Sequence, residues 1–242
     1  MIVRTYENQE AIGSAAAALF AACVIAKPQA VLGLATGSTP IPTYQKMAEL
    51  YRTGAVDFSG VTTFNLDEYV GLNHEHEQSY YAFMMKNLFE HINVPHSRIH
   101  VLSGIAADPA AECRAYEECI AAAGGIDLQI LGIGRNGHIA FNEPSDSFPP
   151  VTHVVELTES TIEANTRFFS SSDEVPRQAL SMGIGSIMKA KSIVLIATGS
   201  DKAQAVKAMV DGPVTPRCPA SVLQLHPSVT LMLDSDAAAL LR

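Results

Sequence analysis

The chain has 242 residues, 48% of them hydrophobic and 17% charged, which suits one large α/β domain over residues 1–242. Its formal net charge of −9 argues against a protein that binds nucleic acid or an anionic membrane. Four cysteines without a C-x-x-C pair indicate reduced thiols in a cytoplasmic protein, and the N-terminal residues lack the apolar region of a signal peptide. The apolar run 15–26 is too short to span a bilayer and predicts a packed helix.

Short apolar runs typical of buried strands alternate with helical patterns along the chain. Strands are expected at residues 30–35, 61–66, 99–102, 126–133, 192–197 and 229–233, with an edge strand at 154–157. Helices are expected at 11–26, 41–52, 78–92, 108–123, 202–211 and 220–224, and a mixture of helix and loop at 174–189. Because apolar runs separated by helices indicate a parallel sheet buried on both faces, the predicted fold class is α/β.

Four of these strands end in polar, acidic or glycine-containing turns. The turns read T-G-S-T-P at 36–40, N-L-D-E-Y at 65–69, G-R-N-G-H at 134–138 and T-G-S-D-K at 198–202. The carboxyl ends of parallel strands share one edge of the sheet, and open α/β sheets bind their ligands there. We therefore expect the four turns to converge on one site.

The third turn belongs to the most informative stretch, L-G-I-G-R-N-G-H-I-A-F-N-E-P. Its glycines, Gly132, Gly134 and Gly137, allow left-handed backbone or a close approach that a side chain would block. His138 is the side chain type that most easily moves a proton near neutral pH, and the Glu143 carboxylate can fix its tautomer and stabilise its cation. A surface or capping histidine is the alternative, but the density of polar groups in one turn favours a functional site.

Two other turns have the composition of anion-binding sites. Backbone N–H groups and hydroxyls of the turn Thr36, Gly37, Ser38 and Thr39 can hold a phosphate at the start of the following helix, although they can also simply cap that helix. Lys202 opposes the dipole of its own predicted helix, which an anionic ligand would explain. Arg167, in N-T-R-F-F, is a further candidate for a phosphate contact, with a surface arginine as the alternative.

Asp67 and Glu68 follow an apolar strand. One acid there could cap a helix, whereas two acids at the ligand edge suggest that one is a proton-transfer base. His74 and His76 form an H-x-H pair without a third ligand nearby in sequence, so no metal site is predicted. No G-x-S-x-G elbow, Walker A motif or full G-x-G-x-x-G fingerprint opens a βαβ unit, which argues against serine hydrolysis and nucleotide binding.

Taken together, the blocks L-A-T-G-S-T-P, F-N-L-D-E-Y-V-G-L, L-G-I-G-x-N-G-H-I-A-F-N-E-P, T-R-F-F, G-S-D-K-A and L-Q-L-H-P resemble the glucosamine-6-phosphate deaminase family. They occur in order from about residue 30 to residue 233. The resemblance implies a three-layer, modified Rossmann-like fold and the conversion of glucosamine 6-phosphate to fructose 6-phosphate and ammonia in amino-sugar catabolism. It also implies a hydrolase acting on a carbon–nitrogen bond, without a metal or organic cofactor.

The resemblance also assigns roles. Asp67 matches the base that removes the C2 proton of the open-chain sugar and returns a proton at C1. His138 matches the group that opens the pyranose ring, and Glu143 matches its orienting carboxylate. Asn136 stands where many relatives have Asp, which removes a negative charge beside His138 and should favour the neutral imidazole. The phosphate partners implied are the turn 36–39, Arg167 and Lys202.

Two departures concern regulation. Longer, hexameric relatives bind an allosteric activator, N-acetylglucosamine 6-phosphate, through basic residues where this chain has His153 and Val155. The sequence also ends at Arg242 without a long C-terminal extension. We therefore expect no such activation, and a monomer or small homo-oligomer.

Two other functions are alternatives to the deaminase activity that the resemblance implies. A 6-phosphogluconolactonase shares the fold and a G-H turn but lacks the N-L-D-E-Y and F-N-E-P blocks. A sugar-phosphate sensor of the kind found in bacterial regulators would carry a DNA-binding segment, whereas this sequence has no basic helix-turn-helix region. Such a sensor could also lose its catalytic acids, whereas this sequence retains Asp67, His138 and Glu143.

Overall fold

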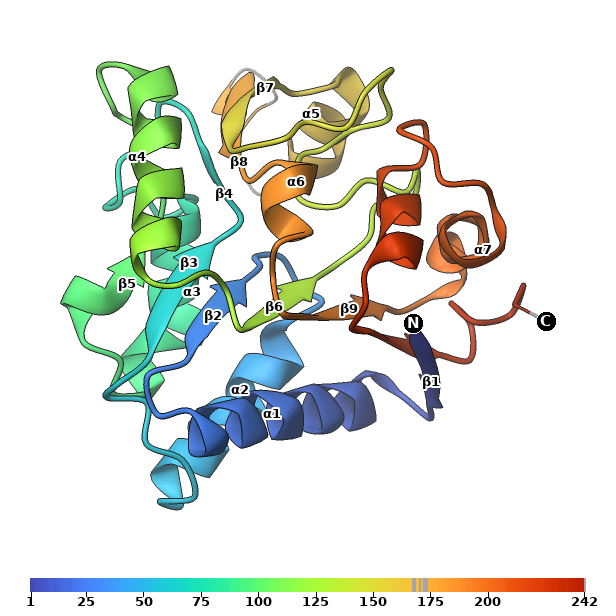
Figure 1. The fold of residues 1–242 in the computed structure, drawn as a ribbon. Coiled ribbons are helices and arrows are strands. Elements are labelled where there is room, and N and C mark those ends of the chain that lie inside the picture. Colours follow the sequence, from blue (N-terminus) through green and yellow to red (C-terminus); the bar gives the residue numbers. More distant parts are fainter. Residues whose placement is uncertain (167–168, 170, 172–173, 242) are drawn as a thin grey trace.

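The computed structural model describes residues 1–166, 169, 171 and 174–241. Its main element is a seven-stranded, parallel sheet in the order β1-β10-β9-β6-β2-β3-β5 (Figure 1). The strands are β1 Ile2–Tyr6, β2 Val31–Leu34, β3 Thr62–Asn65, β5 Ile99–His100, β6 Leu128–Leu131, β9 Ser192–Ala197 and β10 Val229–Asp234. The predicted α/β class with helices around a mostly parallel sheet is confirmed.

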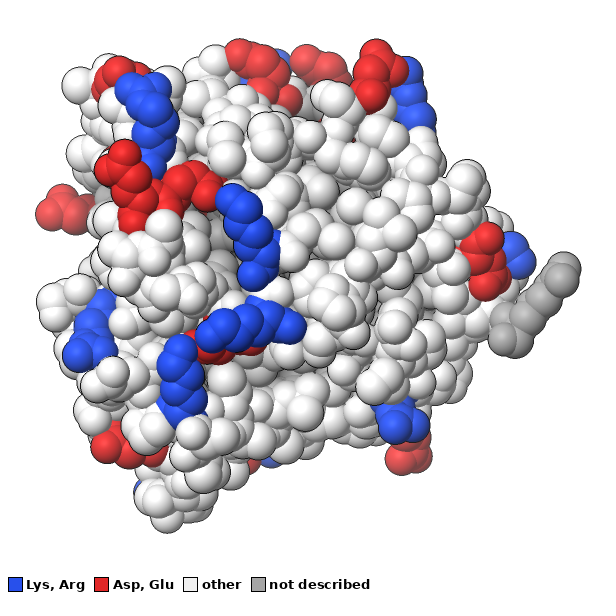
Figure 2. Space-filling model, in the orientation of Figure 1, with Lys and Arg blue, Asp and Glu red and all other residues white. Residues whose placement is uncertain are grey.

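Helices cover both faces of this sheet. In Figure 1, α1 and α2 pack together below it, and α4 and α6 lie on the other side. The helices are α1 Gln9–Ala26, α2 Ile41–Arg52, α3 Tyr80–Asn87, α4 Pro109–Ala122, α5 Glu159–Thr166, α6 Ile184–Ile187 and α7 Ala203–Asp211. Short 3₁₀-helices occur at Phe89–His91, His96–Arg98 and Ser200–Lys202, and a longer one at Pro219–Leu225. The face of the molecule drawn in Figure 2 is largely uncharged.

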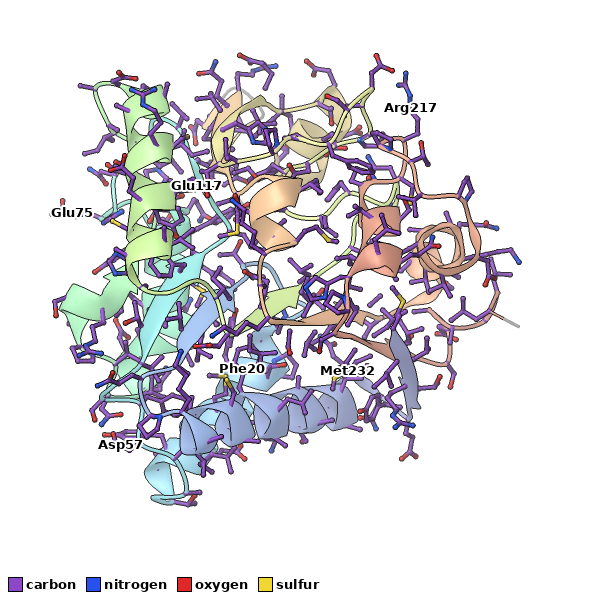
Figure 3. All side chains as sticks on the ribbon, in the orientation of Figure 1. Phe20, Asp57, Glu75, Glu117, Arg217 and Met232 are labelled. Atoms are coloured by element: carbon purple, nitrogen blue, oxygen red, sulfur yellow. The ribbon has the colours of Figure 1, made fainter. Side chains whose placement is uncertain are left out.

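The central strands are buried on both faces because their residues are apolar without alternation. The apolar, Ala-rich helix α1 presents Ile12, Ala16 and Phe20 to this core. Phe20 of α1 and Met232 of β10 lie between the helix and the sheet (Figure 3). The long apolar run 15–26 is therefore part of a core helix, as the sequence predicted.

A second, three-stranded sheet has the order β4-β8-β7 and is antiparallel. It consists of β4 Asp67–Tyr69, β8 Gln178–Ser181 and β7 His153–Glu156. The carboxylate of Glu117 on α4 joins it to the rest of the fold, because it accepts hydrogen bonds from the backbone and hydroxyl of Thr152 (2.8 and 2.6 Å) and from Ser186 (2.5 Å). In Figure 3, Glu117 lies between α4 and α6.

Two sequence expectations were wrong. Segment 174–189 contains strand β8 as well as helix α6, and β8 gains its ladder from β4 and β7. Asp67–Tyr69 is strand β4 and not a turn. Strand β1, an exposed edge strand with little apolar pattern, and helix α5 are not predicted from the sequence. The edge strand expected at 154–157 is confirmed as β7, at the edge of the second sheet.

The two edges of the main sheet differ. At the amino ends of the strands, Asp127 accepts hydrogen bonds from Lys27, Lys191 and the Val31 backbone, each at 2.7 Å. A cavity of about 330 Å³ lies at the same edge, lined among others by Cys23, Asp127 and Ser192. The glycine-containing turns predicted to form the site lie at the other edge, where the strands end.

Candidate active site

The path of the chain through the sheet brings the predicted turns together. From β2 the chain continues outward to β3 and β5, and it then returns to β6 on the other side of β2. The sheet order therefore reverses between β2 and β6, and ligands of open α/β sheets bind outside the carboxyl ends at such a point. The strands β3, β2, β6 and β9, which carry the four turns, are consecutive neighbours.

The turn after β6 is built around the His138 ring. The Gly137 N–H donates to the Gly134 carbonyl at 3.0 Å, and Gly137 has a φ of +84° that favours glycine. A Cβ on Gly134 would lie 2.3 to 2.5 Å from three atoms of the imidazole, so only glycine leaves room for the ring. Gly132 differs from these two, since a Cβ there would meet open space and its φ is not positive. The structure thus gives no reason for glycine at 132.

A second turn brings Glu143 back to His138. Its residue Ala140 has a φ of +49°, a conformation uncommon for a residue other than glycine. The Asn142 N–H donates to the Ile139 carbonyl at 3.1 Å and closes the turn. Backbone strain of this kind is typical of functional sites, and here it bends the chain between the two residues that the sequence predicted to work together.

His138, Glu143 and Asn136 are in direct contact. Nδ1 of His138 lies 3.2 Å from Oε1 of Glu143, an ion-pair distance, although the ring is not aligned for a hydrogen bond. The Asn136 side-chain N–H donates to Oε2 of Glu143 at 2.6 Å. The side-chain oxygen of Asn136 accepts the His138 backbone N–H at 3.2 Å. Asn136 therefore orients Glu143 through an N–H group, which an aspartate carboxylate does not possess.

The two neighbouring acids have different surroundings. Asp67 is 7% exposed, and its Oδ1 has no hydrogen-bond partner among the described residues. Burial, with a smaller effect of the Glu68 carboxylate, raises the pKa of Asp67 to about 8. Glu68 is fully buried and accepts the backbone N–H groups of Tyr69, Tyr80 and Tyr81 at 2.9 to 3.0 Å. Burial raises the pKa of Glu68 to about 7 in spite of these bonds, which lower it. Glu68 thus fixes the start of α3 through its hydrogen bonds. One carboxylate oxygen of Asp67, by contrast, makes no hydrogen bond among the described residues.

Strand β8 links Asp67 to the His138 loop. Ser181 pairs with Asp67 across the antiparallel ladder, and its hydroxyl accepts the Phe141 N–H at 3.1 Å. The next residue, Met182, donates its N–H to Leu66 at 2.7 Å and accepts the side-chain amide of Asn142 at 2.9 Å. Ser181, the last residue of β8, and Met182, which follows it, therefore hold the base and the imidazole loop in one neighbourhood. The sequence does not predict this connection, because it does not predict β8 as a strand.

The turn after β2 leaves open space beside Gly37. Gly37 has a φ of +91°, and a Cβ on it would meet no atom within 4 Å. The N-cap of α2 is Pro40 without a side-chain hydrogen bond, so the hydroxyls of Ser38 and Thr39 do not cap this helix. The alternative of an ordinary Ser/Thr cap is therefore wrong. The phenol of Tyr44 fixes the start of the turn by bonding to both backbone groups of Ala35 (3.1 and 2.5 Å).

Lys202 lies in the 3₁₀ turn Ser200–Lys202, directly before α7, with 25% of its side chain exposed. Arg167 lies outside the described residues. The metal alternative has no support in the histidine pair, because the ring of His74 stacks on Tyr81 at 4.1 Å and that of His76 faces Phe169 at 6.5 Å. Within the described part of the chain, no three His, Cys, Asp or Glu side chains are grouped to hold a metal.

Residues 6–232 match the model of the family "Glucosamine-6-phosphate isomerases/6-phosphogluconolactonase". The chain therefore belongs to this family. A glucosamine-6-phosphate deaminase of Alkaliphilus oremlandii is 55% identical over 241 residues, and the match covers 100% of both chains. A deaminase of the same name from Thermoanaerobacter pseudethanolicus is 56% identical, over 97% of this chain and 92% of the relative.

Solved structures agree with this placement. A monomeric glucosamine-6-phosphate deaminase superposes with a TM-score of 0.96 at 45% identity, covering 99% of this chain and 100% of the other. A 6-phosphogluconolactonase from Trypanosoma brucei, with a TM-score of 0.78 at 18% identity over 100% and 98% of the two chains, shares the fold. The modified Rossmann-like architecture predicted from the sequence is thus confirmed.

Proposed function

We propose that this protein converts glucosamine 6-phosphate and water to fructose 6-phosphate and ammonia. The reaction is an aldose–ketose isomerisation followed by loss of the amine. Moving a proton from C2 to C1 of the open-chain sugar turns the amine-bearing carbon into an imine, and water then adds at C2 as ammonia leaves. The overall stoichiometry is that of a hydrolysis of a carbon–nitrogen bond, whereas the step that needs a catalyst is the isomerisation.

His138 opens the sugar ring in this proposal. The imidazole takes the proton of the anomeric hydroxyl and delivers one to the ring oxygen. Glu143, 3.2 Å away, stabilises the imidazolium formed between these two transfers. Asn136 keeps Glu143 in place through its 2.6 Å hydrogen bond. General acid–base catalysis of this kind typically contributes about 10²–10⁴-fold to a rate.

Asp67 removes the C2 proton. A catalytic base works best when its pKa is near the working pH, and burial brings the pKa of Asp67 to about 8. The carboxylate form, which is the base, gains population as the pH rises towards 8. The ammonium group of a bound amino sugar would also favour the carboxylate, because an opposite charge nearby lowers the pKa of an acid.

The phosphate is held by the turn Thr36, Gly37, Ser38 and Thr39 together with Lys202 and Arg167. The open Gly37 turn at the start of α2 supplies backbone N–H groups. Binding energy from this remote end of the sugar fixes the reacting end beside Asp67 and His138. We propose no metal or organic cofactor, since proton transfers by side chains account for every step.

We further propose a cytoplasmic enzyme that is a monomer or small homo-oligomer, binds neither nucleic acid nor membranes, and lacks activation by N-acetylglucosamine 6-phosphate. The solved structure that is 45% identical is described as monomeric. His153 and Val155 lie in β7, where the longer relatives carry basic residues. Hyperbolic kinetics that the acetylated sugar leaves unchanged would agree with this proposal, and sigmoidal kinetics that it makes hyperbolic would contradict it.

The observation that carries the proposal is that Ser181 and Met182 contact both the Leu66–Asp67 segment and the loop that carries His138. The test is ammonia release from glucosamine 6-phosphate by the wild type, Asp67→Asn and the exposed control Asp211→Asn. We expect activity in the wild type and control and its loss in Asp67→Asn. Hydrolysis of 6-phosphogluconolactone without ammonia release would instead favour the lactonase.

A further inference from the structure

A charged contact joins the turn after β6 to the turn after β9. Nε of Arg135 lies 2.8 Å from Oδ2 of Asp201, and Nζ of Lys202 lies 3.7 Å from the same oxygen. Arg135 precedes Asn136 at the tip of the His138 turn, and Asp201 precedes Lys202 in the proposed phosphate turn. Both turns are known from the sequence, but their pairing through these charges is visible only in the structure.

Asp201 poses a problem for an anion site. A carboxylate beside a phosphate-binding lysine repels the phosphate and competes with it for the ammonium group. Arg135 is the cation closer to Asp201, and it donates the hydrogen bond. The Arg135 guanidinium is also the main cause that holds the pKa of Asp201 below its usual value, ahead of Lys202. The Asp201 charge is thus compensated mainly by a residue outside the phosphate turn.

Fold stability does not account for this pair. The side chains of Arg135 and Asp201 are 78% and 42% exposed, and ion pairs this exposed contribute little to stability. The backbone of the phosphate turn has another anchor, because the Gly199 N–H donates to both carboxylate oxygens of Asp234 (3.1 and 2.9 Å). The contact between Arg135 and Asp201 is therefore not needed to hold the phosphate turn in place.

We propose that Arg135 is a positioning residue for substrate phosphate: it engages the Asp201 carboxylate and so leaves the Lys202 ammonium to the phosphate. The inference rests on the phosphate role proposed above for Lys202. Arg135 acts through Asp201 and does not itself touch the sugar. Because the same arginine lies next to Asn136, it also ties the phosphate turn to the loop that carries His138.

A double-mutant cycle tests this proposal through the Michaelis constant for glucosamine 6-phosphate and the inhibition constant of inorganic phosphate. Arg135→Gln should raise both constants about two- to fivefold at low ionic strength, with kcat within about twofold, as expected for a partly exposed charge pair. The effect should shrink as salt is added. Asp201→Asn should not weaken binding, and the double variant should return both constants to near the wild-type values, because no charge is left to neutralise.

The exposed arginine of α4 provides a matched control. Arg114 lies 3.9 Å from Asp108, so Arg114→Gln removes a similar pair away from the site and should leave both constants unchanged. Equal constants for Arg135→Gln and the wild type would overturn the inference. So would a double variant as impaired as Arg135→Gln alone, because the arginine would then contact the phosphate directly.

Lys202→Gln separates this inference from the proposed function. A large rise in both constants for Lys202→Gln with no change for Arg135→Gln leaves the phosphate role intact and rejects the role of Arg135. Unchanged constants for Lys202→Gln would reject both. Thermal melting of each variant, expected within a few degrees of the wild type, shows that the kinetic changes do not arise from unfolding.

Discussion

Asn136→Asp is a small change that the structure predicts to have a large effect. The Asn136 amide donates to Oε2 of Glu143 at 2.6 Å. An aspartate would place a second carboxylate against Glu143, where like charges about 4 Å apart repel by about 1 kcal/mol in water and about 4 kcal/mol at the effective dielectric near a protein surface. A hydrogen bond to a charged group, worth about 1.5–3 kcal/mol, is lost as well. We expect kcat/KM at pH 7 to fall about tenfold or more.

The added charge should also move the pH dependence. A negative charge raises the proton affinity of neighbouring groups and favours the imidazolium form of His138. Groups that must lose a proton before the reaction then do so at higher pH, so the acidic limb of the profile shifts upward. The acidic limb of Asn136→Asp should therefore lie at higher pH than that of the wild type.

The assay is ammonia release between about pH 5.5 and 9.5, with Asn136→Ala as the control. Alanine removes the hydrogen bond but adds no charge, so it should lower the rate and leave the acidic limb in place. An Asn136→Asp profile that overlays the wild type would refute the reasoning. It would mean that the Asn136–Glu143 contact does not influence proton transfer at His138.

Three further predictions follow from the buried acids and the glycine turn. Burial raises the pKa of Asp67 to about 8. The contribution of this carboxyl group to the stability of the fold is therefore lost as the pH rises from about 4 through 8. Asp67→Asn should thus raise Tm at pH 8 and make Tm depend less on pH. Gly134→Ala places a Cβ against the His138 ring and should cost about 10²-fold in kcat, whereas Gly132→Ala should be tolerated. Glu68→Gln weakens three backbone hydrogen bonds and should lower unfolding free energy by about 1–3 kcal/mol in a urea titration.

The strand ends were predictable because they combine apolar runs with glycine and polar residues, which are local signals. The strands β1 and β8 were not, since each has a weak apolar pattern and pairs with strands distant in sequence. The adjacency of β2 and β6 likewise depends on topology. Sequence alone predicted the turns of the candidate site but not the contacts between them.

The different roles of Asp67 and Glu68 could not be predicted from the sequence either. Both are acids at the end of one strand, and only the three backbone donors around Glu68 identify it as structural. Arg135 and Asp201 stood inside predicted turns, but a contact across 66 positions leaves no local signal. Asn136 was recognised as a departure from the family pattern, while its role as a donor to Glu143 required coordinates.

The claim that His138 opens the sugar ring and Asp67 removes the C2 proton is tested most directly with glucosamine 6-phosphate deuterated at C2. The wild type should move the label to C1 of the product or to solvent. Asp67→Asn should retain the C2 label and release no ammonia, yet still speed the interconversion of the sugar's anomers through His138, as followed by NMR. Loss of the C2 label from Asp67→Asn at the wild-type rate would contradict the account.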